Sequence, residues 1–492
     1  MAKTGMSSDK QSGITARGSG VLLPVFSLPG KYSCGSFGKE AFDFIDFLAD
    51  CGFSYWQVLP FCMTDEYNSP YKSFSAFAGN PYFIDLRRLA DEGLLTEKEL
   101  SEAEQNTPYV CEYERLGKER LDLLRLAASR SGDDLKKAIT DFTEADRYLA
   151  DACRFLALKE ANHNLPWYEW TVSEYSEEEL FFRRFVQYFF FGQWEKVRKH
   201  AASRGVKIIG DIPIYVSYDS ADVCFGRELF LTDREGRPSA VAGVPPDYFS
   251  ADGQLWGNPI YDWKKMKKDG YGWWRARLAH ELSLFDGVRI DHFRGLESYW
   301  SVPAGAETAK EGHWEKGPGK SFIRMLSEIS DGKLIIAEDL GVITDEVTAL
   351  REYGNFPGMR VLQFAFLGDP DSPHLPHNYV KNCVAYTGTH DNNTLLGWLW
   401  ELDPGTRSRI LEYMGYSGNW EASISTIIRR MLASSAGAVI FPLQDLLGYG
   451  SDTRLNRPGN AAGNWSYRVT YDQLSQIDRG YYAYLNRLYA RI

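Results

Sequence analysis

Several features that would assign a protein to a particular class are missing from this sequence. No run of 18 apolar residues is present, so neither a membrane-spanning helix nor a membrane partner is expected. The seven cysteines are odd in number and include no Cys-x-x-Cys pair, which favours reduced thiols in the cytoplasm over a disulfide framework. The formal net charge is −11 and the basic residues are scattered, so no nucleic-acid partner is expected.

The motifs of several enzyme classes are also absent. No Gly-x-Gly-x-x-Gly loop follows the first predicted strand, no Gly-x-Ser-x-Gly is present, and Gly-Lys-Ser at 319–321 lacks the spacing of a phosphate-binding loop. Only eight histidines occur. His374 and His377 have a ligand-like spacing but lie in a Pro-rich loop, so no metal and no other cofactor is expected.

What the chain does contain is a series of eight short runs that predict β-strands. Most are continuously apolar, as strands covered by helices on both faces should be. The runs are Gly20–Phe26, Tyr55–Pro60, Lys207–Val216, Gly287–Phe293, Lys333–Leu340, Gly358–Phe366, Cys383–His390 and Ala438–Leu443.

Helical patterns separate many of these runs. The clearest are Phe42–Ala49, Glu177–Ala202, Ser321–Ile329 and Ile424–Ala433. Alternation of eight strands with helices predicts an α/β protein, a (β/α)8 TIM barrel with helical and loop insertions at the catalytic face. A doubly wound open sheet is the rival, but it lacks support from a Gly-rich loop after the first strand.

The spacing of the runs predicts the domain organisation. Residues 1–18 are polar and Gly/Ser-rich and predict a disordered tail, and residues 19–492 then form the catalytic barrel. About 145 residues separate the second and third runs, which predicts a mostly helical insertion over 61–176. A second insertion over 217–286 contains Val241–Trp263, whose Gly, Pro and aromatic residues predict an ordered loop that acts as a lid over a cleft.

Acidic residues stand near the carboxyl ends of four of the runs. Asp211, Asp291, Glu338 and Asp391 occupy these positions. The carboxyl ends of barrel strands surround the mouth where the catalytic residues of such barrels lie, so the four acids are expected to converge there. A role in packing suits such positions poorly, and chemistry suits them well.

The surroundings of each acid suggest different tasks. Arg289 lies two residues before Asp291 on the same strand face, and its charge favours an ionised Asp291, as a nucleophile requires. Glu338 follows an apolar stretch, and desolvation there would raise its pKa, as a general acid requires. The alternatives are a buried Arg–Asp pair for Asp291 and a helix cap for Glu338.

The other two acids are less specific taken alone. His390 and Asp391 are neighbours and can reach one ligand only if the chain leaves strand geometry there; a strand-terminal turn explains them equally well. Asp211 could orient Arg289, hold a sugar hydroxyl or serve in a turn. Together, an ionised Asp and a protonated Glu best suit cleavage of a glycosidic bond through an oxocarbenium-like transition state, with a third carboxylate holding the distorted sugar.

The motifs around these residues resemble the 4-α-glucanotransferases, also called amylomaltases or disproportionating enzymes, which are relatives of the α-amylases. The similar segments span almost the whole chain after residue 18. They are Tyr55–Pro60, 69–71, Ser73–Pro81, Asp211–Val216, Pro245–Pro259, Arg289–Gly295, Ala337–Gly341, Thr387–Thr394 and Asn456–Trp465. One departure occurs at Tyr467, where many members carry a second Trp.

The resemblance implies a role for each matching residue. Asp291 would be the nucleophile, Glu338 the acid/base and Asp391 the stabiliser of the transition state. The implied substrate contacts are Arg289, His390, Asp211, Trp256, Tyr55, Asp247, Tyr248, Gln254 and Asn464. Trp256 and Tyr55 would stack on sugars beside the scissile bond.

The implied activity is transfer of α-1,4-glucan segments between maltooligosaccharides through a covalent glycosyl-enzyme, with retention of configuration and without a cofactor. The implied partners are therefore α-1,4-glucans, and nothing in the sequence indicates an oligomeric state. An α-amylase-type retaining hydrolase would share the three carboxylates. A non-catalytic glucan-binding protein would usually lack one of them.

Overall fold

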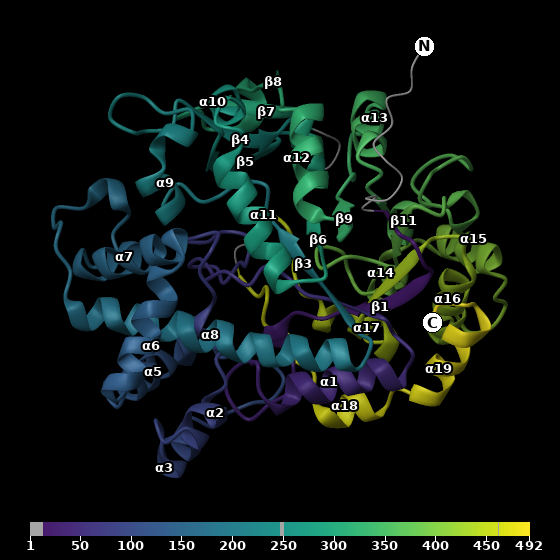
Figure 1. Ribbon diagram of the computed structural model, residues 1–492. Helices are drawn as coiled ribbons and strands as arrows, with labels where there is room; N and C mark the ends of the chain where they lie inside the picture. The colour runs from purple at the N-terminus through teal and green to yellow at the C-terminus, as the bar shows by residue number, and fades with distance from the viewer. Residues whose placement is uncertain (1–12, 247–249, 461) are drawn as a thin grey trace.

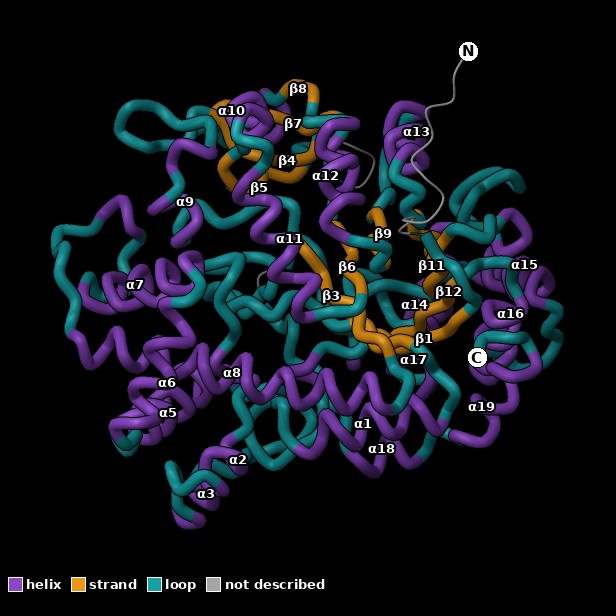
Figure 2. Tube along the Cα trace, in the orientation of Figure 1, coloured by secondary structure: helices purple, strands orange, loops and turns teal. Residues whose placement is uncertain are grey.

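The computed structural model describes residues 13–246, 250–460 and 462–492 of the chain. Within these residues, eight parallel strands close into a barrel in the order β1-β12-β11-β10-β9-β6-β3-β2 (Figure 1, Figure 2). The strands are β1 (Gly18–Leu22), β2 (Tyr55–Gln57), β3 (Lys207–Ile212), β6 (Gly287–Ile290), β9 (Leu334–Ala337), β10 (Gly358–Val361), β11 (Cys383–Tyr386) and β12 (Ala438–Pro442). The predicted barrel is confirmed, and each of the eight predicted runs contributes one strand.

Most of the strands end earlier than the apolar runs predicted. The run Gly287–Phe293 continues past β6 into a turn of 3-10 helix over Phe293–Leu296, and Phe293 is fully buried there. Apolar character therefore cannot mark where a strand ends, because the residues after it still pack into the core. As a consequence, Asp291, Glu338 and Asp391 lie in the segments that follow their strands, whereas Asp211 still lies inside β3.

Helices cover the outside of the barrel, because each presents an apolar face to the strands. Those that follow the barrel strands or flank them are α1 (Lys39–Asp50), α8 (Glu177–Ser203), α11 (Gly272–Leu284), α12 (Lys320–Ser330), α13 (Asp345–Tyr353), α14 (Leu395–Glu401), α15 (Pro404–Met414), α16 (Ile424–Ala433), α17 (Leu443–Leu447), α18 (Tyr471–Ser475) and α19 (Arg479–Leu488). The four predicted helices all form. No helix among the described residues has the length and apolarity needed to cross a membrane.

A group of helices lies within residues 61–176, and several of them pack against α8 (Figure 1). They are α2 (Leu86–Asp91), α3 (Glu97–Glu102), α4 (Tyr113–Arg115), the π-helical turn Leu116–Arg120, α5 (Leu121–Ser129), α6 (Asp133–Glu144) and α7 (Arg147–Ala161). The segment before α4 lies against the carboxyl-terminal region, where the Cys111 N–H donates to the Ser466 carbonyl over 2.7 Å. The Tyr113 hydroxyl donates to the Trp465 carbonyl over 2.6 Å.

A second sheet accompanies the barrel, and the sequence did not predict it. Its four strands run in the order β5-β4-β7-β8. They are β4 (Ala240–Val244), β5 (Gln254–Pro259), β7 (Ser298–Pro303) and β8 (His313–Lys316), and Figure 2 shows them in orange, apart from the barrel. The prediction that Val241–Trp263 is a loop was therefore wrong. Gly and Pro suggested a loop, but antiparallel pairing with β7 supplies the hydrogen bonds that make β4 a strand.

The predicted insertion over 217–286 includes both extra elements and part of the barrel. The short helices α9 (Ala221–Phe225) and α10 (Trp263–Lys268) lie within it. Helix α11 also falls in this range, but it packs against β3 and β6 as a helix of the barrel wall. At the other end of the chain, most of the predicted tail 1–18 lies outside the described residues, and Gly18 already belongs to β1.

Candidate active site

A cleft of about 1300 Å³ opens at the carboxyl ends of the barrel strands. Six of the predicted site residues line it: Gln254, Trp256, Asp291, Glu338, His390 and Asp391. Arg289 and Asp211 lie beneath its floor, and their side chains are 5% and 0% exposed. Asp247 and Tyr248 lie outside the described residues. The acids at the ends of β6, β9 and β11 therefore share one cavity, as their positions predicted.

A buried arginine holds Asp291 from below. Arg289 and Asp291 lie on the same strand face, and Arg289 Nη2 donates to Asp291 Oδ1 over 2.6 Å. Arg289 Nη1 donates to both oxygens of Asp211, over 2.8 and 2.7 Å. Burial alone would lower the pKa of Arg289, but the two carboxylates raise it well above its usual value. The guanidinium therefore stays charged and orients an Asp291 carboxylate whose side chain is 32% exposed to the cleft.

Asp211 completes this support from the end of β3. Besides Arg289, its carboxylate accepts a hydrogen bond of 2.7 Å from the Tyr71 hydroxyl. Since the Asp211 side chain is fully buried and bonded by these two residues, the structure favours a role in orienting Arg289 over direct contact with a sugar. Tyr71 itself lines the cleft.

Glu338 follows directly after β9, and its carboxyl group is held by backbone donors. The His292 N–H donates to Oε2 over 2.7 Å, and the Leu340 N–H donates to Oε1 over 2.9 Å. Burial and the nearby Asp291 raise the pKa of Glu338 to about 7, although Arg289 and the two N–H groups act in the opposite direction. Glu338 can therefore both hold and release a proton near neutral pH.

Glu338 does not cap the following helix. Helix α13 begins at Asp345 with Thr344 as its N-cap residue, so the alternative that the sequence left open is not what the structure has.

An unusual backbone conformation at His292 brings its N–H group within hydrogen-bond distance of Glu338. His292 has φ = 47°, in the left-handed region that few residues with a side chain adopt. The chain turns sharply there after β6, and the His292 N–H reaches the Glu338 carboxyl group. Strain of this kind is often found at functional sites. Burial lowers the pKa of the His292 imidazole to about 4, so the ring is neutral, and it lies edge-on to Trp256 at 4.9 Å.

Asp391 lies in a very different environment from Glu338. His390 Nε2 is 3.3 Å from Asp391 Oδ2, and Asn456 Nδ2 donates to Oδ1 over 2.6 Å. Desolvation would raise the pKa of Asp391, but His390, Asn456 and Arg289 together hold it well below its usual range. Burial acts to lower the pKa of the His390 imidazole, but the neighbouring Asp391 outweighs burial and raises that pKa above its usual value. Asp391 is therefore an anion at neutral pH, whereas Glu338 is partly protonated.

Aromatic rings form two walls of the cleft. Tyr71 and His390 are stacked with centroids 5.1 Å apart, and Trp465 lies 6.0 Å from each of them. On the second sheet, Trp256 lies 6.2 Å from Tyr215, and its indole N–H donates to Gln254 Oε1 over 3.1 Å. Flat rings beside carboxylates suit a sugar, which presents apolar faces and hydroxyl edges.

Two of the predicted substrate contacts, Tyr55 and Asn464, do not line the cleft. Tyr55 is the first residue of β2, so it lies at the amino-terminal end of the barrel, where it lines another cavity together with Lys207, Gly287 and Leu334. The cleft lies at the opposite end. Asn464 does not line the cleft. Its side chain braces a loop by accepting from the Arg457 N–H over 2.9 Å and donating to the Asn460 carbonyl over 2.8 Å.

The residues that replace these two were within the motifs already singled out. Tyr71 belongs to Ser69-Pro70-Tyr71, and it lines the cleft, whereas Tyr55 lines another cavity. Asn456 and Trp465 bound the segment that contains Asn464, and His292 lies beside Asp291. All four line the cleft. The motifs indicated the correct segments, but not which side chain of each faces the cavity.

Comparison with known proteins identifies close relatives. A family model described as 4-alpha-glucanotransferase matches residues 23–474. A 4-alpha-glucanotransferase of Synechocystis sp. is 44% identical over 96% of this chain and 98% of its own length. One of Thermus thermophilus is 42% identical over 93% of this chain and 96% of its own length.

Solved structures agree with these relatives. Amylomaltase from Streptococcus agalactiae in complex with acarbose has a TM-score of 0.93 and 36% identity, over 96% of this chain and 99% of that chain. Amylomaltase from Corynebacterium glutamicum has a TM-score of 0.81 at 18% identity, over 97% of this chain and 76% of that chain, a likeness of fold alone.

Proposed function

Since this chain belongs to the 4-alpha-glucanotransferase family, we propose that Asp291, Glu338 and Asp391 divide the chemistry of glucan transfer among them. The resemblance seen in the sequence motifs is confirmed, and the chain is a transferase of the glycoside-hydrolase type. The α-amylase-type hydrolase is not favoured. The proposed reaction is a retaining double displacement, in which each of the three acids has its own task.

In the first step, the Asp291 carboxylate attacks the anomeric carbon of an α-1,4-linked glucan. The bond from that carbon to the bridging oxygen breaks, and Glu338 gives its proton to the departing oxygen. A covalent glycosyl-enzyme results, joined through Asp291, and the released chain carries a new 4-hydroxyl group. The contact with Arg289 supports this role, because it orients the Asp291 side chain into the cleft.

In the second step, the 4-hydroxyl of an acceptor glucan attacks the same carbon. Glu338, now a carboxylate, takes the hydroxyl proton, and the bond to Asp291 breaks. Two inversions give net retention of configuration. A carboxyl group with a pKa of about 7 suits both halves of this cycle, because it must act first as acid and then as base.

Asp391 and the walls of the cleft hold the substrate. An anionic Asp391 stabilises the positive charge that develops on the sugar ring and binds its hydroxyls. His390, Trp256 and Gln254 contact the sugars, while Arg289 and Asp211 position Asp291 from below. Asp247 and Tyr248 stay predictions as further contacts. The substrates are α-1,4-glucans and maltooligosaccharides, in line with the acarbose complex of the Streptococcus agalactiae amylomaltase.

The single observation that carries this assignment is the opposite tuning of two acids in one cleft. Glu338 has its pKa raised to about 7, and Asp391 has its pKa held well below the usual range. A non-catalytic glucan-binding protein has no need for a buried carboxyl group that titrates near neutral pH.

Incubation with maltotriose tests the function. Glucose together with a ladder of longer oligosaccharides is the expected product pattern, whereas glucose and maltose alone would indicate hydrolysis. Asp291→Asn should lower the rate of transfer by about 10⁴-fold or more while circular dichroism shows an intact fold. A variant that keeps a near-normal rate would disprove Asp291 as the nucleophile.

A further inference from the structure

A buried carboxylate that the mechanism does not use lies beneath the loop that carries His390 and Asp391. It belongs to Asp445 on α17, and Asp445 is 1% exposed. It does not line the cleft. Buried acids are costly unless something binds them, so its partners show what it does.

Asp445 contacts both ends of that loop. Thr387, the first residue after β11, donates from its Oγ1 to Asp445 Oδ2 over 2.5 Å. Leu395, the first residue of α14, donates its N–H to Asp445 Oδ1 over 2.7 Å. One carboxyl group thus joins the two points at which residues 387–395 leave the strand and enter the helix.

Other contacts hold the loop elsewhere. Near its tip, Arg454 Nη2 donates to the Asp391 carbonyl over 2.6 Å, and the Asn456 N–H donates to the His390 carbonyl over 3.1 Å. Near its second end, Gln363 Nε2 donates to the Asn393 carbonyl over 2.7 Å. Asp445 differs from these groups because it fixes the distance between the two ends.

We propose that Asp445 is a positioning residue for the transferase reaction, setting the base of the 387–395 loop so that Asp391 and His390 meet the sugar at the correct place. The inference rests on the role of Asp391 in the proposed function. Asp445 touches neither substrate nor reacting atoms.

The chemistry of the two contacts supports this role. Both are hydrogen bonds from neutral donors to a carboxylate in a buried place, where such bonds are strong and directional. Burial also raises the pKa of Asp445 to about 6, so the group depends on these two donors to stay ionised. Displacement of a catalytic group by about 1 Å can lower the rate about 10²-fold. A small shift of the loop base would move Asp391 and would therefore lower the rate.

The test compares Asp445→Ala with Asp445→Asn in the full-length enzyme. We expect Asp445→Ala to lower kcat for maltotriose about 10- to 100-fold, with KM changed less than about threefold. Asp445→Asn should restore most of the rate, because an amide can accept from the Leu395 N–H and donate to Thr387 Oγ1. A matched control is Asp85→Ala, which removes another buried carboxylate at a helix start, that of α2, and should leave kcat nearly unchanged.

A double-mutant cycle separates positioning from general destabilisation. All four enzymes of the cycle are measured with α-glucosyl fluoride as donor. In the Asp391→Asn background, Asp445→Ala should then lower the rate less than about threefold, because the contribution of Asp391, through which Asp445 acts, has already been removed. Equal loss in both backgrounds would overturn the proposal, as would a normal rate for Asp445→Ala. A near-normal rate for Asp391→Asn alone would instead disprove the proposed function.

Thr387→Val keeps the test decisive if Asp445→Ala does not fold. It removes one of the two donors while preserving the shape of the side chain. We expect a loss of about three- to tenfold in kcat that disappears in the Asp391→Asn background. A loss that persists there would overturn the proposal.

Discussion

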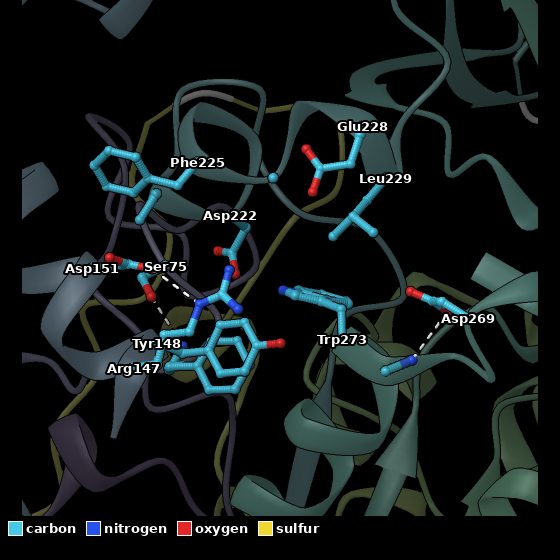
Figure 3. A pocket seen from close by; sticks show the side chains of 14 residues that line it. Ser75, Arg147, Tyr148, Asp151, Asp222, Phe225, Glu228, Leu229, Asp269 and Trp273 are labelled. Atoms are coloured by element: carbon cyan, nitrogen blue, oxygen red, sulfur yellow. Dashed lines mark hydrogen bonds and ion pairs between the residues drawn. The ribbon is translucent and has the colours of Figure 1, made fainter. Parts of the chain in front are cut away.

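Among the pockets of the described residues, two that place carboxylates beside aromatic rings can be compared directly, and of these two only the first is arranged for glycoside chemistry. The first is the cleft at the barrel mouth. The second, of about 690 Å³, lies between α7, α9 and α11 (Figure 3). Figure 3 shows its four acids spread around the cavity, with Tyr148 and Trp273 between them. The acids are Asp151, Asp222, Glu228 and Asp269.

Three of the four acids of the second pocket serve local structure. Asp222 accepts from the Ala76 N–H over 2.9 Å, and Asp269 accepts from the Gly272 N–H over 3.2 Å. Asp151 is paired with Arg154 at 3.1 Å. Burial raises the pKa of both Asp151 and Asp222, so these two shift in the same direction.

The difference shows how the surroundings of an acid tune its carboxyl group. In the cleft, the carboxyl groups of Glu338 and Asp391 are tuned in opposite directions, and Arg289 holds the third, Asp291, from below. Both pockets bring carboxyl groups and aromatic rings together. The arrangement of positive groups and hydrogen-bond donors around each acid is what differs.

The sharpest way to test this contrast is Glu338→Gln. Loss of the general acid should lower transfer from maltotriose about 10²- to 10⁴-fold, because the glycosidic oxygen then leaves without a proton. With α-glucosyl fluoride, whose leaving group needs no proton, the initial release of fluoride should be much less affected. Asp222→Asn in the second pocket is the control and should keep the normal rate. Equal losses with both donors would contradict the role of Glu338.

The next largest expected effect is the dependence of the transfer rate on pH. Because Glu338 must carry a proton to act as the acid, and its pKa is about 7, kcat/KM for maltotriose should fall as the pH rises through 7, by about tenfold for each further unit. Below that pH the group is protonated and this loss is absent. The alkaline fall should disappear in Glu338→Gln, and a wild-type rate that stays constant up to pH 9 would argue against this tuning.

The smallest expected effects come from the second pocket. Tyr148→Ala and Asp222→Ala should change transfer less than about twofold, because neither residue contacts the catalytic cleft. Asp222→Ala should nevertheless lower the free energy of unfolding by about 1–3 kcal/mol, because the Ala76 N–H loses its acceptor. Urea unfolding measures this loss. A tenfold fall in transfer for either variant would show that the second pocket takes part in catalysis.

Local pattern was enough to predict most of the fold. The eight apolar runs each overlap a barrel strand, and helix α16 occupies Ile424–Ala433 as predicted. The second sheet was missed because β4 and β5 contain Gly and Pro and owe their form to pairing with distant segments. The residues of a strand do not by themselves indicate which distant segment the strand will pair with.

The candidate site was likewise predicted only in part. Strand ends predicted that Asp291, Glu338 and Asp391 would meet, and they do line one cleft. Position along a motif was a poorer guide to the substrate contacts, since Tyr55 faces the opposite end of the barrel from Tyr71. Which side chain of a segment faces a cavity depends on where the strand begins, and the apolar run alone does not mark that point.

By itself, the sequence determined the barrel, the meeting of its acids and the pairing of Arg289 with Asp291, because these two residues share a face by simple alternation. Only the tertiary structure decided which partners each acid has. The His292 N–H reaches Glu338 from the end of another strand, Asn456 reaches Asp391 across 65 positions of the chain, and Asp445 joins the two ends of the loop that carries Asp391. A pKa depends on the charges, donors and solvent around a group, and folding brings these together from segments far apart in the chain.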